Sequence, residues 1–369
     1  MKLGILGGGQ LARMLALAAY PLNIQCAFLD PAKDACAGPL GKFINAPYDD
    51  ENGLNQLAQW ADQIAFEFES VPASILKSLA SQVPVFPGHK ALLITQDRYE
   101  EKQFFQNLGV DTAAFVAVNT LDDLRKAVLS LGRPSILKSR RLGYDGKGQA
   151  FIDEHSDLAQ AFESIGKVPS ILEGYIKFDR EVSIIAVRAE NGDTKFYPLV
   201  ENIHRHGILH TSFVLENDPQ QQQAENMVRK LMDNLDYVGV IVLELFQVGD
   251  QLLANEYAPR VHNSGHWSIE GAVTSQFENH IRAVCGKPLG DTGMTVPSAM
   301  INIIGSLPDC NEVLKIPGAH LHLYNKQARE GRKLGHVTVC AKTDSLLRQH
   351  VDKIMPLARI IPPAAEKQD

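Results

Sequence analysis

The stretch LELFQVGDQLLANEYAPRVHNSGHWSIEGAVTSQFENH, residues 243–280, decides how the chain is organised. It begins in an apolar run typical of a β-strand, passes through a Gly249-Asp250 turn signal and enters a second short apolar run, so it predicts a β-hairpin. In a hairpin centred on Asp250, Glu244 and Glu256 lie directly opposite each other, with Cβ atoms about 5 Å apart. Two carboxylates this close repel each other, whereas a divalent cation such as Mg²⁺ binds such a pair together with phosphate oxygens. A longer or shorter loop would instead send the two glutamates to opposite faces.

The segment after the second strand carries polar side chains with neither the strand nor the helix period. Packing alone does not require imidazole, amide and guanidinium groups in such a run, so we interpret it as one wall of a functional site. For His266 and Trp267, core packing beneath the site is the preferred alternative. The polar residues concerned are Asn255, Arg260, His262, Asn263 and His266.

Length and composition indicate a globular protein of two or three domains. The chain has 369 residues, of which 45% are hydrophobic and 21% charged. Its net charge of −7 argues against nucleic acid as a partner. Cations gather only locally, at Lys138–Lys147 and Arg329–Lys333, which suits a small anionic ligand.

The cysteines and the apolar runs indicate a cytoplasmic protein with no membrane partner. Five scattered cysteines without a CxxC pair are typical of a reduced compartment and argue against a disulfide frame or a zinc site. The longest apolar stretch, LARMLALAAYPL, contains Arg13 and stops at Pro21, which is too short to span a bilayer. Glycines interrupt the first apolar run, so no secretory signal is expected.

The beginning of the chain predicts a doubly wound domain. The strand KLGIL leads into a Gly7–Gly9 loop, a helix and a second strand that ends at Asp30, an order that mimics a dinucleotide-binding fingerprint. The third glycine position is Ala12, so the pattern fits a nicotinamide-cofactor domain and equally any doubly wound domain whose helix N-terminus holds a phosphate. Farther on, QIAFEFESVP predicts a strand with Glu67 and Glu69 on one face, the alternative being a solvated edge.

A glycine-rich loop separates two strands in the middle of the chain. The strand PSILKS ends in Lys138, and the loop RRLGYDGKGQ precedes the strand AFID. A P-loop opens a helix, so this loop is not one. Its glycines and flanking cations predict a flap that closes over a polyphosphate and offers it backbone N–H groups and positive charge. A basic hairpin without a ligand is the alternative.

The order of these signals resembles the ATP-grasp superfamily, which holds ATP between two α+β lobes. Within it, the chain is similar over essentially its whole length to the ATP-dependent carboxylases of bacterial and fungal purine synthesis that make N5-carboxyaminoimidazole ribonucleotide. The stretches that carry the resemblance are GGGQLARM, FEFESVP, QDRYEEK, LKSRRLGYDGKGQ, LEGYI with EVS, NEYAPRVHNSGHW and GRKLGHV, of which the last two discriminate best.

The resemblance implies an α/β ATP-grasp fold built from α+β lobes. The expected domains are an N-terminal doubly wound, Rossmann-like domain on the substrate side (1–100), a small central lid domain with the glycine flap (101–181) and a C-terminal mixed α/β domain with the metal and carboxylation site (182–369). A homodimer is expected from the family alone.

The implied activity is that of a carbon–nitrogen ligase in de novo purine biosynthesis. Aminoimidazole ribonucleotide, bicarbonate and ATP would give N5-carboxyaminoimidazole ribonucleotide, ADP and phosphate. Bicarbonate is a poor electrophile, so it is first phosphorylated to carboxyphosphate, and a lid would protect this labile intermediate from water. Mg²⁺ is the implied metal, with Mn²⁺ as a substitute.

The resemblance also assigns residues by position. The metal ligands would be Glu244 and Glu256. The ATP-binding residues would be Arg98, Lys138, Gly143, Tyr144, Asp145, Gly146, Lys147, Gly148, Gln149, Glu173, Gly174, Tyr175, Ile176, Glu181, His204, Asn255 and Glu256. The substrate-binding residues would be Gln10, Leu11, Glu67, Asn263, Arg332 and Lys333. The catalytic residues would be Arg260, His262, Tyr144 and Asp145.

Several of these assignments have alternatives. Arg260 would hold bicarbonate or the carboxyphosphate oxyanion in a bidentate manner, and either His262 or the departing phosphate would take the amine proton. Without the resemblance, Glu181 could be an ordinary strand-end acid and His204 an ordinary surface histidine. Glu67 and Glu69 compete for the substrate contact.

Three other classes of function are considered. A nicotinamide-dependent oxidoreductase would explain GGGQLA and Asp30, but it leaves the glutamate pair, the flap and GRKLGH without a role. A non-catalytic ATP-grasp relic has no need of both metal carboxylates together with Lys138 and RVHNSGH. Within the superfamily, a formate-using ligase is the remaining alternative, because a biotin-carboxylating enzyme would need a much longer chain.

Overall fold

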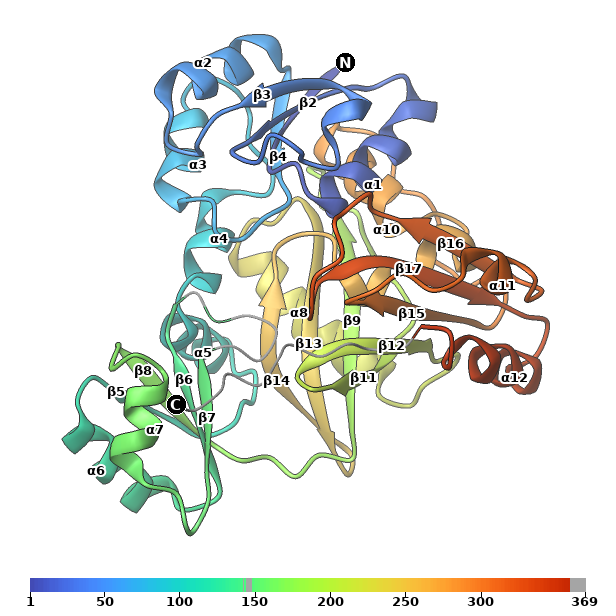
Figure 1. The fold of residues 1–369 in the computed structure, drawn as a ribbon. Coiled ribbons are helices and arrows are strands. Elements are labelled where there is room, and N and C mark those ends of the chain that lie inside the picture. Colours follow the sequence, from blue (N-terminus) through green and yellow to red (C-terminus); the bar gives the residue numbers. More distant parts are fainter. Residues whose placement is uncertain (142, 144–147, 359–369) are drawn as a thin grey trace.

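The computed structural model describes residues 1–141, 143 and 148–358, and three β-sheets organise this part of the chain. In Figure 1 the first sheet lies at the top, another lies at the lower left, and the largest fills the centre and right of the molecule. The α/β class expected from the sequence is confirmed. No helix of the described residues is long and apolar enough to cross a membrane.

The N-terminal sheet is parallel and doubly wound, with the strand order β3-β2-β1-β4. Its order reverses between β1 and β4, and ligands of open α/β sheets bind at the carboxyl ends of strands at such a point. The elements are β1 (Lys2–Leu6), α1 (Gln10–Ala19), β2 (Gln25–Asp30), β3 (Lys42–Asn45), α2 (Glu51–Trp60), β4 (Gln63–Phe66) and α3 (Ala73–Leu79).

One boundary differs from the sequence expectation. The strand predicted in QIAFEFESVP ends at Phe66, so Glu67 and Glu69 lie in the loop beyond β4 and do not share a strand face. Glu67 is 7% exposed and folds back over the glycine loop, whereas Glu69 reaches Arg260. Neither residue therefore forms the solvated edge that was the alternative.

A smaller antiparallel sheet follows, with the order β5-β8-β6-β7 and helices on one side. Two helices lead into it, α4 (His89–Thr95) and α5 (Arg98–Asn107). Its own elements are β5 (Phe115–Val118), α6 (Leu121–Leu131), β6 (Ser135–Ser139), β7 (Gln149–Ile152), α7 (Leu158–Ser164) and β8 (Ser170–Gly174).

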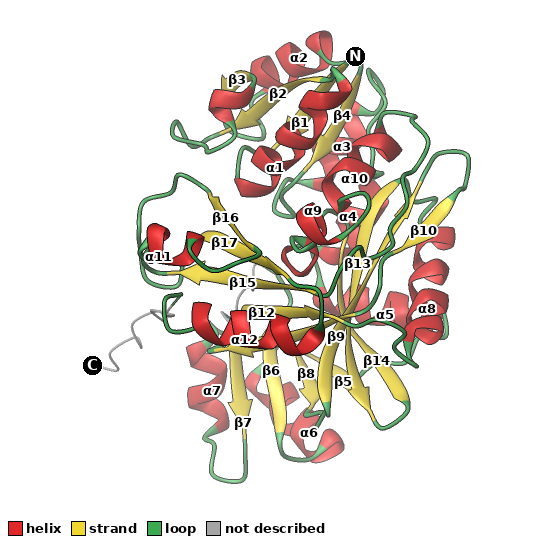
Figure 2. Cartoon of the chain, turned by 90° about the vertical axis from the view of Figure 1, so that its right-hand side faces the viewer, coloured by secondary structure: helices red, strands yellow, loops and turns green. Residues whose placement is uncertain are grey.

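The third sheet has nine strands in the order β14-β13-β9-β11-β12-β15-β17-β16, with β10 paired to β9. Figure 2 shows its helices packed outside the strands. The strands are β9 (Arg180–Arg188), β10 (Thr194–Phe196), β11 (Val200–Arg205), β12 (Ile208–Val214), β13 (Gly239–Val248), β14 (Gln251–Ala258), β15 (Ser298–Ile304), β16 (Ala319–Leu323) and β17 (Lys333–Cys340). The helices are α8 (Gln221–Asn234), α9 (Ser268–Gly271), α10 (Gln276–Val284), α11 (Cys310–Leu314) and α12 (Asp344–Ile354).

The first and third sheets share one apolar core. Leu15 of α1 belongs to the same buried cluster as Val240 of β13 and Phe277 and Ile281 of α10. Burial of apolar area is the main favourable term in folding, so this cluster fixes the glycine loop against the large sheet. The loop and the glutamate hairpin are thereby held in one geometry.

Candidate active site

The glutamate hairpin has the predicted pairing but reaches it by another route. Val248 pairs with Gln251 across a two-residue Gly249-Asp250 turn, a register that by itself would place Glu244 opposite Asn255. The register shifts at a β-bulge between Leu245 and Glu244. Leu245 pairs with Ala254, whereas Glu244 pairs with Glu256, so Asn255 is the extra residue. A bulge inserts one unpaired residue and re-aims its neighbours. The bulge therefore brings the two carboxylates opposite each other, with Asn255 beside them.

The two carboxylates differ in their electrostatic surroundings. Burial and the charge of Glu256 raise the pKa of Glu244 to about 8. Partial burial also raises the pKa of Glu256, but Arg98, whose Nη1 lies 2.8 Å from Oε2, outweighs it and holds that pKa below its usual value. Without a further positive charge, Glu244 retains its proton at neutral pH.

A divalent cation fits this pair. Oxygen ligands are those that Mg²⁺ prefers, and a cation would allow Glu244 to ionise beside Glu256. Among the described residues, no group of three or more His, Cys, Asp or Glu side chains could hold a metal ion. The protein therefore offers two carboxylates, and the other ligands would come from nucleotide phosphates or water.

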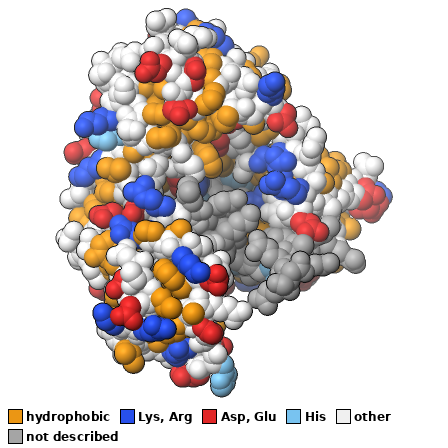
Figure 3. Space-filling view, turned by 60° about the vertical axis from the view of Figure 1, so that its left-hand side comes forward, with side chains coloured by type: hydrophobic (Ala, Val, Ile, Leu, Met, Phe, Trp, Pro, Cys, Tyr) orange, Lys and Arg blue, Asp and Glu red, His pale blue; other side chains and the backbone are white. Residues whose placement is uncertain are grey.

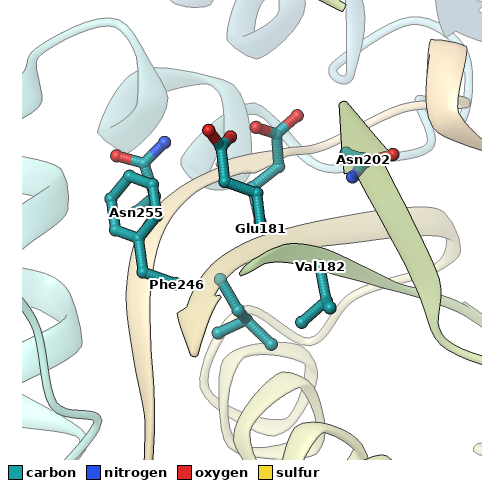
Figure 4. Close-up of a pocket in the computed structure, with 7 residues that line it drawn as sticks. Glu181, Val182, Asn202, Phe246 and Asn255 are labelled. Atoms are coloured by element: carbon teal, nitrogen blue, oxygen red, sulfur yellow. The ribbon is translucent and has the colours of Figure 1, made fainter. Parts of the chain in front are cut away.

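A small pocket lies against the paired glutamates, between β9, β11 and the hairpin (Figure 4). Glu181 and Asn255 project to the same side of the strands, the ring of Phe246 lies beside Asn255, and Val182 points away. His204 Nδ1 lies 2.9 Å from Glu181 Oε2. Although burial lowers it, the pKa of His204 is raised overall by Glu181 and Glu244. Glu181 and His204 thus belong to the same polar wall as the hairpin.

A buried charge network continues this wall towards the small sheet. Lys138 Nζ lies 2.9 Å from Glu173 Oε2, and Lys102 Nζ lies 3.8 Å from Glu173 Oε1. Glu173 and Lys102 are 3% and 2% exposed. Although burial raises it, the two lysines lower the pKa of Glu173 to about 2. The Glu173 side chain is therefore an ionised partner of two lysines, beyond the backbone role expected for it.

The hinge between the small and the large sheet has few free backbone donors. The Gly174 N–H donates to Ala114 O at 2.9 Å, and the Tyr175 N–H donates to Pro134 O at 3.2 Å. The N–H groups of Gly174 and Tyr175 are therefore already bonded, whereas the sequence led us to expect backbone contacts to adenine in this segment.

The described part of the glycine flap touches the glutamate site. Arg98 Nη2 donates to Gly143 O at 3.2 Å. Gly148 has a φ of +69°, and a Cβ there would lie 2.5 Å from Ser139 Oγ, so this position requires glycine. Gln149 opens β7. The predicted flap residues Tyr144, Asp145, Gly146 and Lys147 lie outside the described residues.

The glycine loop after β1 is closed by two carboxylates from the protein itself. Gly8 N–H donates to Asp30 Oδ2 at 2.7 Å, and Gly9 N–H donates to Glu67 Oε1 at 2.8 Å. Tyr48 OH also donates to Asp30 at 3.0 Å. The Asp30 carboxylate already accepts hydrogen bonds from within the protein. In a dinucleotide-binding fingerprint the acid at this position binds the ribose, and Asp30 is not free to do so.

Basic residues gather beside this loop. Lys326 donates to Gln10 Oε1. Burial lowers the pKa of Lys326, and the nearby charges of Arg332 and Lys333 lower it further. The Leu11 side chain is 7% exposed and belongs to the core, so Leu11 offers only its backbone at the first turn of α1. A helix N-terminus next to several cations is a suitable site for a phosphate.

The residues predicted for the carboxylation centre lie between these two regions. Arg260 Nη2 lies 3.0 Å from Glu69 Oε1, and His262 Nε2 lies 3.1 Å from Glu244 Oε1. Asn263 is less available, because it exchanges hydrogen bonds of 3.0 and 2.6 Å with the buried Asn302.

The protonation of His262 follows from its neighbours. Its Nδ1 accepts from the Ser264 N–H at 3.4 Å and faces Ser264 Oγ at 3.0 Å, so the ring proton is assigned to Nε2, which lies 3.1 Å from Glu244 Oε1. Burial, together with Arg260 and Lys333, holds the pKa of His262 well below its usual value. His262 is therefore a neutral imidazole whose Nε2 lies next to Glu244.

Sequence reasoning missed two cations of the site. Lys102 is a buried lysine on helix α5, three residues before Phe105, and a lysine on the apolar side of an amphipathic helix could have been noticed. Lys326 lies only three residues before the basic cluster that the sequence did suggest. His266 and Trp267 are 1% and 0% exposed, which agrees with the core-packing interpretation.

The chain is an ATP-grasp enzyme. It has a lid-like small sheet, a large sheet with paired carboxylates, and buried lysines between the two sheets. The ATP-grasp domain family matches residues 103–277, the ribonucleotide synthetase preATP-grasp domain family matches residues 1–96, and the phosphoribosylaminoimidazole carboxylase C-terminal domain family matches residues 298–350.

Individual relatives narrow the class. The N5-carboxyaminoimidazole ribonucleotide synthase of Pseudomonas aeruginosa is 49% identical over 357 residues, which cover 97% of this chain and 99% of that protein. The enzyme of the same name from Brucella melitensis is 46% identical over 91% of this chain and 95% of its own length. The chain therefore belongs to the N5-carboxyaminoimidazole ribonucleotide synthase family.

Solved structures of proteins with the same name have the same fold. The synthetase from Thermus thermophilus superimposes with a TM-score of 0.92 at 46% identity and covers 100% of both chains. The synthase from Aspergillus clavatus, in complex with ADP and 5-aminoimidazole ribonucleotide, gives a TM-score of 0.88 at 33% identity over 96% of this chain and 97% of that one.

Proposed function

We infer that the chain is an ATP-dependent ligase that carboxylates 5-aminoimidazole ribonucleotide with bicarbonate in purine biosynthesis. The products are N5-carboxyaminoimidazole ribonucleotide, ADP and phosphate. The observation that carries this assignment is the position of Glu244, Glu256 and Arg260 between a lysine-rich nucleotide wall and a cation-lined glycine loop. An enzyme that joins an activated bicarbonate to a ribonucleotide amine needs both anion sites on either side of one reaction centre.

For the nucleotide, we propose the wall formed by the hairpin, the hinge and the small sheet. Lys138 and Arg98 neutralise phosphate oxygens, and Glu181 accepts from the ribose hydroxyls. His204 orients Glu181, to which it lies 2.9 Å away. Phe246 and Phe178, stacked with centroids 4.8 Å apart, offer an apolar surface close to the hinge.

For the metal, we propose Glu244 and Glu256 as ligands of Mg²⁺, or of Mn²⁺ in its place. When bound, the ion would neutralise charge on the nucleotide phosphates during transfer. Arg98 positions Glu256, and the His262 Nε2–H positions Glu244.

At the reaction centre, we propose that Arg260 holds bicarbonate. A bicarbonate oxygen attacks the γ-phosphorus of ATP, ADP leaves, and carboxyphosphate forms. Its loss of phosphate gives CO₂, which the amine of the ribonucleotide attacks. Neither nitrogen of His262 presents a free lone pair, so the departing phosphate is the better acceptor of the amine proton, and His262 acts by holding Glu244.

For the ribonucleotide, we propose the glycine-loop side of the site. The helix α1 N-terminus with Gln10 and the Leu11 N–H, together with Arg332 and Lys333, binds the 5′-phosphate, and Lys326 adds a third cation to this group. Glu67 already accepts from Gly9, and its second oxygen remains for the substrate. Tyr144 and Asp145 would reach the substrate from the flap, while Asn263 contributes mainly by orientation.

The division into domains follows the sheets. We propose 1–100 as the substrate-side domain, 101–181 as the lid domain and 182–369 as the domain that carries the metal and carboxylation residues. We also propose a homodimer in the cytoplasm, in keeping with the family. On the face drawn in Figure 3, acidic and basic side chains are interspersed, which does not suit a nucleic-acid partner.

A coupled assay of ADP release tests the assignment. ADP release should require bicarbonate together with Mg-ATP, and aminoimidazole ribonucleotide should make it faster. Formate in place of bicarbonate is the control for a formate-using ligase. ADP release that depends on formate and ignores bicarbonate would overturn the assignment.

A further inference from the structure

Lys102 is a buried cation with no role in the mechanism above. It lies on α5 and is 2% exposed, next to Phe104 and Phe105 of the apolar core. Its ammonium group donates to Ala254 O at 3.3 Å and lies 3.8 Å from Glu173 Oε1. Lys102 thus joins three elements that meet at the nucleotide wall: α5, the end of β8 and the bulged strand β14.

The two lysines on Glu173 are not equivalent. The Lys138 side chain is 12% exposed and makes a 2.9 Å hydrogen bond to Oε2, whereas the Lys102 side chain is 3% exposed and stays at 3.8 Å. Among the described residues, no donor reaches Glu173 Oε1 within hydrogen-bond distance. The oxygen nearest to Lys102 is therefore an acceptor still open to a stronger contact.

Binding of a nucleotide creates a conflict for Lys138. The Lys138 ammonium group has three N–H donors, but when it also binds a phosphate its charge is shared between two anions, so its 2.9 Å contact with Glu173 Oε2 weakens. A buried carboxylate that loses its partner is strongly destabilised, so Glu173 alone would hold Lys138 back from the phosphate. A second, permanently buried cation removes this conflict.

We propose that Lys102 is a positioning residue that keeps the Glu173 carboxylate compensated while Lys138 turns to the nucleotide phosphates. The proposal rests on the proposed nucleotide site, and it assigns Lys102 no contact with the nucleotide itself. The hydrogen bond to Ala254 O holds the Lys102 ammonium group beside Glu173. A closer contact of this group with Oε1 would then compensate the carboxylate charge that Lys138 no longer neutralises at Oε2.

The test is a double-variant cycle read by calorimetric titration of the full chain with ADP and Mg²⁺. Lys102→Met should weaken ADP binding about tenfold or more, because Glu173 then retains Lys138. In Lys102→Met/Glu173→Gln no carboxylate retains Lys138, so ADP binding should return to within about threefold of that of Glu173→Gln alone. A merely structural role for Lys102 predicts the opposite, namely that the double variant binds no better than Lys102→Met.

Controls separate the outcomes. Lys126→Met, which removes an exposed lysine of α6, should leave binding unchanged. If the wild-type chain does not bind ADP, the proposed nucleotide site is wrong. If the wild type binds and Lys102→Met binds equally well, only the role of Lys102 is overturned. Circular dichroism checks folding. Should Lys102→Met be unfolded, Lys102→Gln retains a donor for Ala254 and takes its place, and unfolding of both variants would show that Lys102 is structural.

Discussion

At the scale of single residues, the site depends on different surroundings for two side chains of the same type. Glu244 and Glu256 face each other, yet Arg98 keeps the pKa of Glu256 low, while burial and Glu256 raise that of Glu244 to about 8. One carboxylate that is already ionised and another that can become so would together attract a cation. The residue types were readable from the sequence, but the partner that fixes each charge comes from an element distant in the chain.

Glu256→Gln should abolish bicarbonate-dependent ATP hydrolysis while the fold survives. The amide still fills the space but brings no charge to the metal, so the rate of ADP release should fall about 100-fold or more. The coupled assay measures the rate, and circular dichroism checks the fold. Glu163→Gln, which alters an exposed carboxylate of α7, is the matched control. Retained activity in Glu256→Gln would refute the metal role.

Lys333→Ala should mainly raise the KM for the ribonucleotide. A hydrogen bond to a charged group contributes about 1.5–3 kcal/mol, which corresponds to a rise of roughly 10- to 100-fold. Steady-state kinetics with the ribonucleotide as the varied substrate measure it, and Lys353→Ala on the exposed side of α12 serves for comparison. An unchanged KM would mean that the phosphate is bound elsewhere.

At the scale of elements, short-range signals were predictable and exact registers were not. The hairpin at Gly249-Asp250 was predicted correctly because turn residues act locally. Its bulge was not predicted, because the hydrogen-bond partners of β14 on either side of the bulge come from distant parts of the chain. The Ala254 N–H donates to Asp111 O, and the Tyr257 N–H donates to Glu101 Oε1. The premature end of β4 has the same origin, since Glu67 leaves the strand in order to accept a hydrogen bond from Gly9.

A buried histidine on helix α10 predicts that the folding stability decreases at acidic pH. His280 is 0% exposed, its Nδ1 accepts from the Val240 N–H at 3.1 Å, and burial lowers its pKa to about 4. An unfolded histidine, with a pKa near 6.5, binds a proton more readily, so folding stability falls as the pH drops from 6.5 towards 4.

This histidine alone should remove about 2 kcal/mol of stability between pH 7 and pH 5. In His280→Gln the stability at pH 7 should be lower, but the further loss on going to pH 5 should be smaller by that amount. Urea titrations of both proteins at the two pH values measure the difference. An equal loss in the variant would show that His280 is not the group that titrates.

At the scale of the whole molecule, the fold brings the two proposed anion sites, which belong to different sheets, to one centre. The shared core of α1, β13 and α10 fixes the glycine loop against the hairpin. The fold class could be predicted from ordered motifs and their resemblance to a family, and the structure brings the predicted Glu244, Glu256 and His262 together. Lys102 could have been noticed on the apolar side of α5, but the partners of Lys102 and Lys326 appear only when separate segments pack together.

Ligand protection should distinguish an ATP-grasp ligase from a nicotinamide-dependent oxidoreductase. Mg-ADP at about 100 times its Kd should add about 2.7 kcal/mol to the stability of the chain, whereas NAD should add none. Thermal unfolding with each ligand measures this, and the buffer with Mg²⁺ alone is the control. Protection by NAD would point to a nucleotide bound at the glycine loop.

The extra residue in β14 makes the site sensitive to changes in chain length. Successive side chains of a strand alternate between its two faces, so removing Asn255 or inserting a residue between Gln251 and Glu256 would carry the second carboxylate to the wrong side of the sheet. Substitutions in the Gly249-Asp250 turn leave that spacing intact. Anyone grafting this hairpin onto another scaffold must therefore copy its residue count before its residue types.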